Sequence, residues 1–410
     1  MKVLILLTAS FPFDGGEEFL ENELCFAHGF DRIYVCPCGL KPNSVQTREL
    51  PQNVQCLPLK RVSGGRSDYL FLLRLPCVHN ELFSLLRTGK FTAARAHECL
   101  FFMKNAASIV RALKREEAFL AADEITIYSY WFYDAAAAGA LFAKDLRSAG
   151  KRVKFVSRAH GFDIHEERSK NRYLPMRKFL MENAAAVFPC SEEGTKILQN
   201  RFPQFAGKVH TAHLGTREEN CHGGSRAEFH LVSCSYMVPV KRLHLIALAL
   251  GKANFPLRWT HIGSGPLEEE LRRLVKNVPS DVRVDFPGAM KNSDVLKFYR
   301  NRPITVFVNV SSSEGIPVSI MEACSFGIPV IATDVGGTGE IVKDGKNGFL
   351  LKPDFAPEEL LQALDRIRSM NGEDYEKLCK NSRSIWQESF CAERNYPSFY
   401  EVLNQWNCFT

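Results

Sequence analysis

Two glutamates lie on either side of a sequence suited to binding a phosphate. Glu314 and Glu322 belong to the stretch SSSEGIPVSIMEA, in which Pro317 suits the first turn of a helix. The N–H groups near Val318 and Ser319, together with the positive end of the helix dipole, would form an anion site. Carboxylates repel phosphate but accept hydrogen bonds from hydroxyl groups. The pattern therefore predicts a phosphate flanked by a sugar and a ribose. The alternative is a Glu314 that caps the helix and a Glu322 that faces solvent.

A lysine at the expected start of another helix gives a second anion signal. Lys241 ends the loop SYMVPVK and precedes Arg242 and an apolar helical pattern. A cation is unfavourable at a helix N-terminus unless an anion neutralises both. The position therefore predicts contact with a diphosphate. A lysine that points into water is the alternative.

Two loops of the first half could also reach a ligand. His160 directly follows a β-branched run and precedes a glycine, and its ring titrates near neutral pH, which suits contact with a sugar hydroxyl or a polarised oxygen. A structural histidine is the alternative. Gly15 and Gly16 follow the first apolar run and allow a ligand to approach the backbone closely, although alone they describe an ordinary strand-to-helix turn.

These loops belong to a chain in which short apolar runs alternate with helical patterns. Such alternation predicts an α/β protein with parallel sheets covered by helices on both faces, and ligands then bind outside the carboxyl ends of the strands. The predicted strands are Val3–Leu7, Arg32–Cys36, Ile125–Ser129, Val153–Ser157, Ala186–Cys190, Leu231–Ser233, Arg258–Ile262, Val282–Phe286, Thr305–Val310 and Pro329–Ala332.

The length of 410 residues predicts two domains, with a boundary in the polar, glycine-bearing segment 215–225. Residues 1–215 hold 29 Lys and Arg against 22 Asp and Glu, whereas the remainder holds 23 against 24. The basic first half indicates an anionic partner such as a membrane surface or a phosphorylated substrate, with an ordinary solvated surface as the alternative. Residues 67–122 predict two or three amphipathic helices, which either join the core or touch a membrane surface.

Several function classes are disfavoured. The first apolar run has five residues, too few for an export signal, and no run is long enough to span a membrane. Thirteen scattered cysteines fit a reducing cytoplasm, with Cys36 and Cys38 interpreted as buried thiols in preference to a metal site. No nucleic-acid motif, P-loop or Asp-x-Asp pair occurs, and the loop at Gly263 lacks the third glycine of a dinucleotide fingerprint. We therefore expect no metal, no cofactor and no nucleic-acid partner.

The second half resembles the donor domain of retaining glycosyltransferase family 4, which has the two-domain GT-B fold. The matching motifs are MVPVK at 237–241, IGSGPL at 262–267, FPG at 286–288, the pair Glu314 and Glu322, GIPVIATDVGG at 327–337, EIV at 340–342 and NGFL at 347–350. The first half matches through Gly15-Gly16, His160-Gly161 and Ser191-Glu192, and residues 11–23 are similar to bacterial surface-polysaccharide transferases.

The resemblance implies two Rossmann-like domains that face each other across a cleft. Residues 1–215 would bind the acceptor, residues 216–384 the donor, and residues 385–410 would form a helical segment that crosses back to the first domain. Glu314 would hold the donor sugar and Glu322 the ribose, while His160 would lie against the transferred sugar. Lys241 would bind the diphosphate. The other implied donor-binding residues are Gly15, Gly16, Arg242, Gly263, Gly315, Ile316, Pro317, Val318 and Ser319.

The implied activity is transfer of a sugar from a UDP- or GDP-linked donor to a glycan or lipid-linked saccharide, without a metal and with retention of configuration. The reaction would serve bacterial surface polysaccharide synthesis. The implied location is the cytoplasm, with peripheral contact with an anionic membrane as a further option. The family usually has an arginine where this chain has Tyr236, so a catalytically idle sugar-binding protein is one alternative. A nucleotide-sugar epimerase or a phosphorylase-like enzyme of the same fold is the other.

Overall fold

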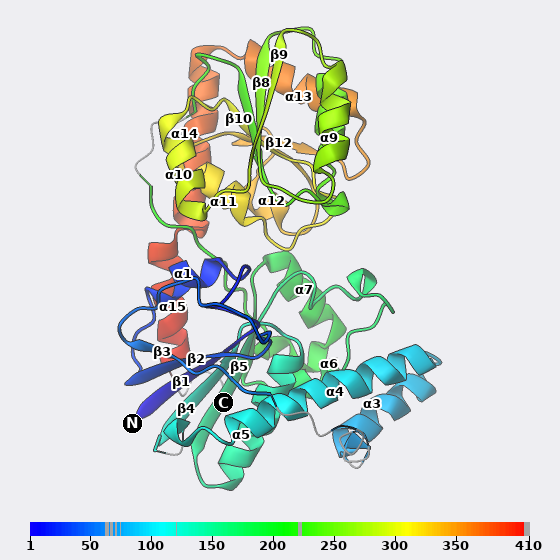
Figure 1. Ribbon diagram of the computed structural model, residues 1–410, viewed down its shortest axis with the longest axis vertical. Helices are drawn as coiled ribbons and strands as arrows, with labels where there is room; N and C mark the ends of the chain where they lie inside the picture. The colour runs from blue at the N-terminus through cyan, green and yellow to red at the C-terminus, as the bar shows by residue number, and fades with distance from the viewer. Residues whose placement is uncertain are drawn as a thin grey trace. The chain divides into compact units, whose positions relative to one another are not determined.

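The computed structural model describes residues 1–61, 65, 69, 72, 73, 75–119, 121–219 and 224–405. The chain divides into two compact units (Figure 1). Unit 1 comprises Met1–His213 and Tyr396–Thr410, and unit 2 comprises Leu214–Asn395. The division after His213 lies two residues before the boundary expected from the sequence. The chain returns to unit 1 at Tyr396, which is later than the expected residue 385.

Unit 1 contains a parallel sheet of six strands in the order β3-β2-β1-β4-β5-β6. The strands are β1 (Lys2–Thr8), β2 (Arg32–Pro37), β3 (Val54–Cys56), β4 (Glu124–Ser129), β5 (Arg152–Ala159) and β6 (Ala186–Pro189). The helices are α1 (Phe19–Leu24), α3 (Pro76–Arg87), α4 (Ala93–Leu113), α5 (Asp134–Ser148), α6 (Arg177–Asn183), α7 (Glu192–Arg201) and the greater part of α15 (Ala392–Asn404), which begins in unit 2.

Both faces of this sheet are covered. Side chains of a strand alternate between faces, and along β1 the residues Val3, Ile5 and Leu7 join one core cluster while Leu4 and Leu6 join another. The first cluster includes residues of α4 and α5, and the second includes residues of α1 and α15. The C-terminal helix is therefore part of the core of unit 1. Trp406, in the segment 385–410 that was expected to cross back to the first domain, lies outside the described residues.

Unit 2 contains a second parallel sheet of six strands in the order β12-β11-β10-β7-β8-β9. The strands are β7 (His230–Cys234), β8 (Leu257–Ile262), β9 (Val282–Gly288), β10 (Val306–Asn309), β11 (Val330–Thr333) and β12 (Gly348–Leu351). The helices are α8 (Leu243–Leu250), α9 (Glu268–Leu274), α10 (Asn292–Asn301), α11 (Val318–Ser325), α12 (Thr338–Ile341), α13 (Pro357–Ser369) and α14 (Gly372–Ser389).

The two sheets have the same topology. In each, the first strand of the unit lies in the middle, the second and third extend to one side, and the fourth, fifth and sixth extend to the other. The strand order therefore reverses between β1 and β4 in unit 1 and between β7 and β10 in unit 2. In open parallel sheets the loops at such a reversal diverge and leave a crevice for a ligand.

All ten strands predicted from the sequence are confirmed, within one or two residues at their ends. Two strands were missed. β3 has only three residues, and β12 begins at Gly348, which has low intrinsic strand preference. Both lie at the edges of their sheets, where the pattern of apolar residues is weakest.

The segment predicted as amphipathic helices contains α3 and α4 in its described part. Leu85 on α3 and Met103 on α4 are buried in the core of unit 1, which confirms the core interpretation for one face of these helices. Leu70 and Arg74, which were part of the same prediction, lie outside the described residues. Within the described residues, no helix combines the length and the apolar character that a membrane span requires.

Candidate functional site

An ion pair lies at the point in unit 2 where the strand order reverses. Lys241 ends a short 3-10 helix (Pro239–Lys241) after β7, and Glu314 belongs to the loop after β10. The Nζ atom of Lys241 lies 2.7 Å from Oε1 of Glu314, and the side chains are 24% and 11% exposed. Nδ2 of Asn309 donates to the same oxygen at 3.2 Å. The cation and the anion predicted from separate motifs are therefore brought into direct contact.

Hydrogen bonds between the two loops hold this pair in place. The N–H of Ser312 donates to the carbonyl oxygen of Val240 at 2.8 Å, and the N–H of Ser311 donates to Oδ1 of Asn309 at 3.0 Å. Asn309 thus supports both the backbone of the loop and the carboxylate of Glu314. The sequence analysis did not single out Asn309, because an asparagine at the end of a strand has no distinctive spacing.

The helix that follows this loop offers its N-terminus. Its N-cap is Pro317, with φ −79° and ψ 103° and no side-chain cap hydrogen bond. Val318 and Ser319 are half-buried at its first turn, while Ile316 is buried beneath. Glu314 does not fill the cap position, so the alternative of a capping Glu314 is wrong. The backbone donors of α11 and the Lys241–Glu314 pair meet at the same loop, an arrangement suited to an anion beside a hydroxyl-bearing ring.

Glu322 lies inside α11 and is only 9% exposed. Its Oε1 accepts a hydrogen bond of 2.6 Å from Nδ2 of Asn292, at the start of α10. The alternative of a solvated Glu322 is therefore wrong. A buried carboxylate held by an amide is suited to accept hydrogen bonds from a diol such as a ribose.

Arg242 has a structural role of its own. It adopts a left-handed conformation, with φ 48°, and this turns its side chain towards the ends of β10 and β11. The guanidinium donates to the carbonyl oxygens of Val310 at 2.8 Å and Pro353 at 2.6 Å, and also reaches Ser311 and Thr333. Contact of Arg242 with a diphosphate stays a prediction. Tyr236, at the position of the missing arginine, is 60% exposed.

Two glycines are required by close backbone contacts around the pair. A Cβ atom on Gly263 would lie 1.9 Å from the carbonyl oxygen of Ser235, and φ is +146°. A Cβ atom on Gly336 would lie 2.1 Å from the carbonyl oxygen of Glu314, and the next N–H, of Gly337, donates to the carbonyl oxygen of Gly315 at 2.7 Å. The glycine-rich motif after β11 therefore packs directly against the loop that carries Glu314.

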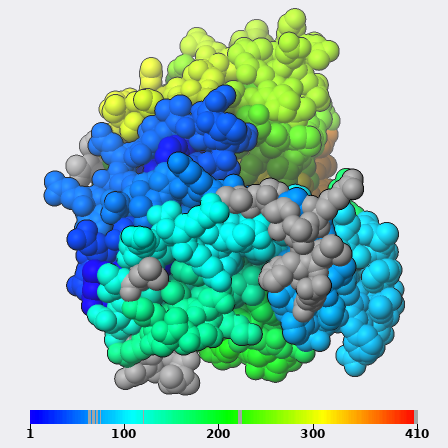
Figure 2. All heavy atoms as spheres, turned by 60° about the horizontal axis from the view of Figure 1, so that its bottom comes forward, coloured from blue at the N-terminus to red at the C-terminus, as the bar shows by residue number. Residues whose placement is uncertain are grey.

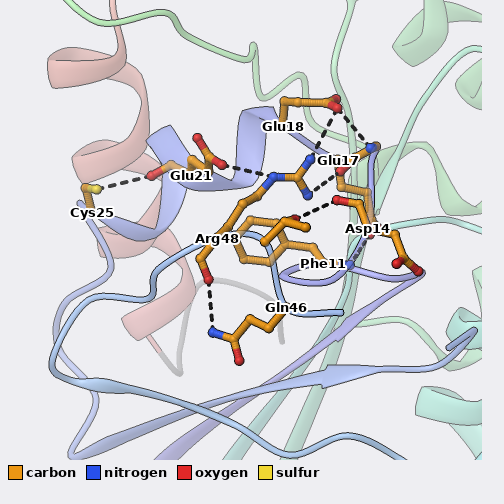
Figure 3. A network of polar contacts seen from close by, with 10 residues as sticks. Phe11, Asp14, Glu17, Glu18, Glu21, Cys25, Gln46 and Arg48 are labelled. Atoms are coloured by element: carbon orange, nitrogen blue, oxygen red, sulfur yellow. Dashed lines mark hydrogen bonds and ion pairs between the residues drawn. The ribbon is translucent and has the colours of Figure 1, made fainter. Parts of the chain in front are cut away.

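In unit 1, the loop with Gly15 and Gly16 is organised by a glutamate that sequence reasoning missed. Glu17 is 5% exposed, and its carboxylate accepts hydrogen bonds from the N–H groups of Ala9, Ser10 and Phe11 at 2.8 to 2.9 Å. It also accepts a hydrogen bond of 2.6 Å from Nε1 of Trp131, after β4. The neighbouring loop residues bind Arg48, which contacts Glu18, Glu21 and the carbonyl oxygen of Gly16 (Figure 3).

His160 is buried at the end of β5. The backbone N–H of His160 donates to Oδ1 of Asp163 at 2.5 Å. The ring atom Nε2 lies 3.1 Å from the carbonyl oxygen of Tyr130, so Nε2 carries the proton and Nδ1 can accept a hydrogen bond. Burial, aided by the charge of Arg158, lowers the pKa of His160 to about 3. The ring is therefore neutral near pH 7 and is suited to accept a hydrogen bond from a hydroxyl group.

Cys36 and Cys38 are both buried, as the sequence analysis expected. Eleven of the thirteen cysteines lie among the described residues, and none of these eleven forms a disulfide. Burial raises the pKa of both Cys36 and Cys38. In the part of the chain that the structure describes, no three His, Cys, Asp or Glu side chains are grouped so as to hold a metal ion.

The predicted site residues thus fall into two sets. Lys241, Arg242, Gly263, Glu322 and the stretch 314–319 gather at the carboxyl ends of the strands of unit 2. Gly15, Gly16 and His160 lie at the corresponding edge of the sheet of unit 1. Asn309, Asn292 and Glu17 were missed because their partners are distant in the sequence or because their geometry depends on the folded loop.

Comparison with known proteins finds relatives of this chain. Residues 225–385 match the family profile described as "Glycosyl transferases group 1". The putative colanic acid biosynthesis glycosyltransferase WcaL of Escherichia coli (strain K12) is 26% identical over 266 residues. This match covers 62% of the chain and 64% of WcaL, so the chain spans about three fifths of the length of that relative.

Solved structures share the fold of the whole chain. HepE of Anabaena, in a complex with UDP, has a TM-score of 0.65 at 17% identity and covers 98% of this chain and 99% of its own. Sucrose-phosphate synthase of Thermosynechococcus elongatus has a TM-score of 0.71 at 18% identity, with 98% of each chain covered. The two-unit α/β architecture is therefore that of GT-B proteins.

Proposed function

We propose that the chain, whose residues 225–385 match the family profile of the group 1 glycosyl transferases, transfers a sugar from a nucleoside diphosphate sugar to an acceptor hydroxyl. The observation that carries this proposal is the contact of 2.7 Å between Lys241 and Glu314 beside the N-terminus of α11. It places a cation, a carboxylate and backbone donors where the strand order reverses.

In this proposal the diphosphate binds at the first turn of α11. The N–H groups of Val318 and Ser319 donate to its oxygens, and Lys241 moves from Glu314 to the phosphate when the donor binds. Glu314, released from the ion pair, then accepts hydrogen bonds from the sugar hydroxyls. Glu322 does the same for the ribose. Negative charge grows on the leaving diphosphate during transfer, and these donors are already oriented to stabilise it.

We propose that the anomeric configuration is retained and that no metal ion is required. The acceptor would attack on the face from which the diphosphate leaves, and a phosphate oxygen would take the proton of the acceptor hydroxyl. Neutral His160 would bind a hydroxyl of the transferred sugar through Nδ1. Lys241 and the α11 N–H groups would supply the positive charge that a metal provides in other enzymes. Activity in the presence of a chelator such as EDTA is the direct test of metal independence.

The donor is proposed to be a UDP- or GDP-linked sugar. HepE, which shares the fold of the chain, was solved in complexes with UDP and with UDP-glucose. The acceptor is proposed to be a glycan or a lipid-linked saccharide of a bacterial surface polysaccharide, since WcaL is named for colanic acid biosynthesis. UDP-glucose is therefore the first donor to test.

We also propose a cytoplasmic enzyme that touches an anionic membrane through α3 and α4. Phe83, Leu86 and Phe101 are 66%, 58% and 50% exposed, and the basic residues Arg87 and Lys90, which follow Leu86 in the sequence, are exposed as well. These helices form part of the outer surface of unit 1 (Figure 2). Apolar side chains bordered by cations suit an anionic lipid surface. Flotation with vesicles that contain phosphatidylglycerol should be stronger than with neutral vesicles.

The proposed donor site is tested with Glu314→Gln. A thermal-shift screen of UDP and GDP sugars first identifies a donor that stabilises the chain by mass action. Release of the nucleoside diphosphate from that donor is then measured. Glu314→Gln should lower kcat/KM about 10²- to 10³-fold, as for loss of a preorganised polar contact. Glu268→Gln is the matched control, because Glu268 forms an exposed pair with Arg272 within α9. Equal activity of Glu314→Gln and Glu268→Gln would refute the assignment of the site.

A further inference from the structure

A cavity lies at the edge of the first sheet, in unit 1, and none of the predicted site residues lines it. Its volume is about 360 Å³, and its lining comes from the end of β1, the segments that follow β1, β2, β3, β4 and β5, and the first turn of α5. β1 and β4 are the strands between which the order of this sheet reverses. The cavity is therefore the counterpart, in unit 1, of the crevice that holds Lys241 and Glu314 in unit 2.

Aromatic rings form much of the cavity wall. Trp131, Tyr133 and Phe162 line it, and the ring centroid of Phe162 lies 5.0 Å from that of Trp131 and 5.9 Å from that of Tyr133. Phe162 is 48% exposed, which is unusual for a phenylalanine. Aromatic faces offer a flat apolar surface, and the C–H face of a sugar ring has a matching shape and polarity.

The indole of Trp131 is held in position rather than free to turn. Its Nε1 donates to the buried carboxylate of Glu17 at 2.6 Å, and its ring lies against His160, with centroids 4.5 Å apart. A side chain fixed by a charge-assisted hydrogen bond and by packing loses little further freedom when a ligand stacks on it. The wall is thus preorganised for a rigid ring.

A charged pair gives the cavity its polar groups. Nη2 of Arg61 lies 3.8 Å from Oδ2 of Asp134, and the side chains are 32% and 23% exposed. This separation exceeds that of a direct hydrogen bond. A hydroxyl group both donates and accepts, so it can bridge the guanidinium and the carboxylate. Because the pair is neutral overall, it favours a neutral sugar over an anionic one.

We propose that this cavity is a binding site for one neutral saccharide unit, stacked on Trp131 and Phe162 and hydrogen-bonded by Arg61 and Asp134. The inference rests on the proposed glycosyltransferase function in so far as it assigns that saccharide to the acceptor. The volume suits one sugar ring and is near the lower limit for ligand pockets. Trp131 lines the cavity and also contacts the ring of His160, so the bound unit lies next to the residue proposed to touch the transferred sugar.

The test measures saccharide binding without donor turnover. Methyl glycosides of glucose, galactose, mannose and N-acetylglucosamine are titrated into the full chain by saturation-transfer difference NMR, with and without UDP. At least one of these glycosides should bind. Phe162→Ala should lower the affinity for that glycoside about tenfold, which is the effect expected from the loss of one stacked ring. Asp134→Asn should weaken the same glycoside, and methyl glucuronide should bind less well than methyl glucoside. Phe91→Ala is the control, since Phe91 is 44% exposed and lies outside the cavity.

The outcomes separate the cavity from the donor site. The cavity assignment is supported if Phe162→Ala no longer binds the glycoside but is stabilised by UDP-glucose as much as the wild-type chain. This support does not depend on the result for Glu314→Gln. Absence of binding by every glycoside, or equal binding by Phe162→Ala and Phe91→Ala, overturns it. If the cavity instead binds an apolar chain, octanol should bind as well as octyl glucoside and the methyl glycosides should not bind. This result also overturns the proposal. Circular dichroism of each variant shows whether it is folded.

Discussion

Glu17 should be a stability residue of unit 1, and Glu17→Gln is the perturbation that tests this. Its two carboxylate oxygens accept four hydrogen bonds: three from the backbone of residues 9–11 and one from the indole of Trp131. Glutamine keeps one acceptor oxygen and replaces the other with an NH₂ group, which faces N–H donors. Two of the four hydrogen bonds are then lost, and buried donors are left without partners.

The magnitude follows from the number of bonds and their charge. A hydrogen bond to a charged group contributes roughly 1.5 to 3 kcal/mol, and an unsatisfied buried donor costs a similar amount. Loss of two such bonds from a side chain that is 5% exposed should lower the free energy of unfolding of unit 1 by about 3 kcal/mol. For a domain of this size, the unfolding temperature should fall by about 6 to 12 °C.

Differential scanning calorimetry is the assay, because it can resolve separate transitions of the two units. Glu18→Gln is the matched control: Glu18 is the next residue and also binds a backbone N–H, that of Gly16, but its side chain is 58% exposed. If the two variants differ in unfolding temperature by less than about 1 °C, the reasoning that a buried carboxylate organises this loop is wrong.

Three further predictions concern the same loops. Arg242→Lys should lower the free energy of unfolding of unit 2 by about 2 kcal/mol in calorimetry, because an ammonium group cannot reproduce the hydrogen bonds of the guanidinium to Val310 and Pro353; an unchanged transition would contradict its structural role. Gly263→Ala should lower the free energy of unfolding by about 2 kcal/mol or more and reduce the thermal shift caused by the donor, because its Cβ would lie 1.9 Å from the carbonyl oxygen of Ser235. Gly251→Ala is the control and should have a small effect, because its Cβ would lie 3.5 Å from the nearest atom. Burial lowers the pKa of His160 from 6.5 to about 3, so the contribution of the neutral ring to the stability of unit 1 is fully present above pH 6.5 and is lost as the pH falls towards 3. When the pH is lowered to one unit below 6.5, chemical denaturation should show that the free energy of unfolding of His160→Gln decreases by about 1 kcal/mol less than that of the wild-type chain. Equal decreases in the two proteins would argue against a neutral buried ring.

The sheets and the placement of Lys241, Glu314 and Glu322 in the proposed donor site could be predicted from the sequence because their signals are local. A buried parallel strand is a short apolar run, and a helix that follows it through a proline indicates an anion site within a few residues. The spacing of Glu314 and Glu322 around Pro317 is therefore enough to place the first in the loop and the second inside the helix. The motif at 237–241 likewise places Lys241 in the segment that follows β7.

The partners of these residues could not be predicted, because they depend on the folded loops. Glu17 has φ +56°, and its carboxylate reaches three N–H groups only after the chain has reversed between residues 11 and 17. The left-handed conformation of Arg242 likewise turns its side chain towards carbonyl oxygens, which charge alone did not indicate. Nothing in the spacing of Asn292 relative to Glu322 indicates that they meet.

The equal topology of the two sheets makes the difference between their crevices a property of the loops. In unit 2, the loops supply Lys241, Glu314 and the backbone donors of α11, which suit an anion and its sugar. In unit 1, the N–H groups after β1 already donate to the carboxylate of Glu17, so they are not available to a phosphate. The same carboxylate fixes Trp131, and an aromatic cavity remains. One glutamate therefore both removes an anion site from the first crevice and fixes an aromatic wall there. Under the proposed function, this difference would let one crevice bind the donor and the other bind a neutral saccharide of the acceptor.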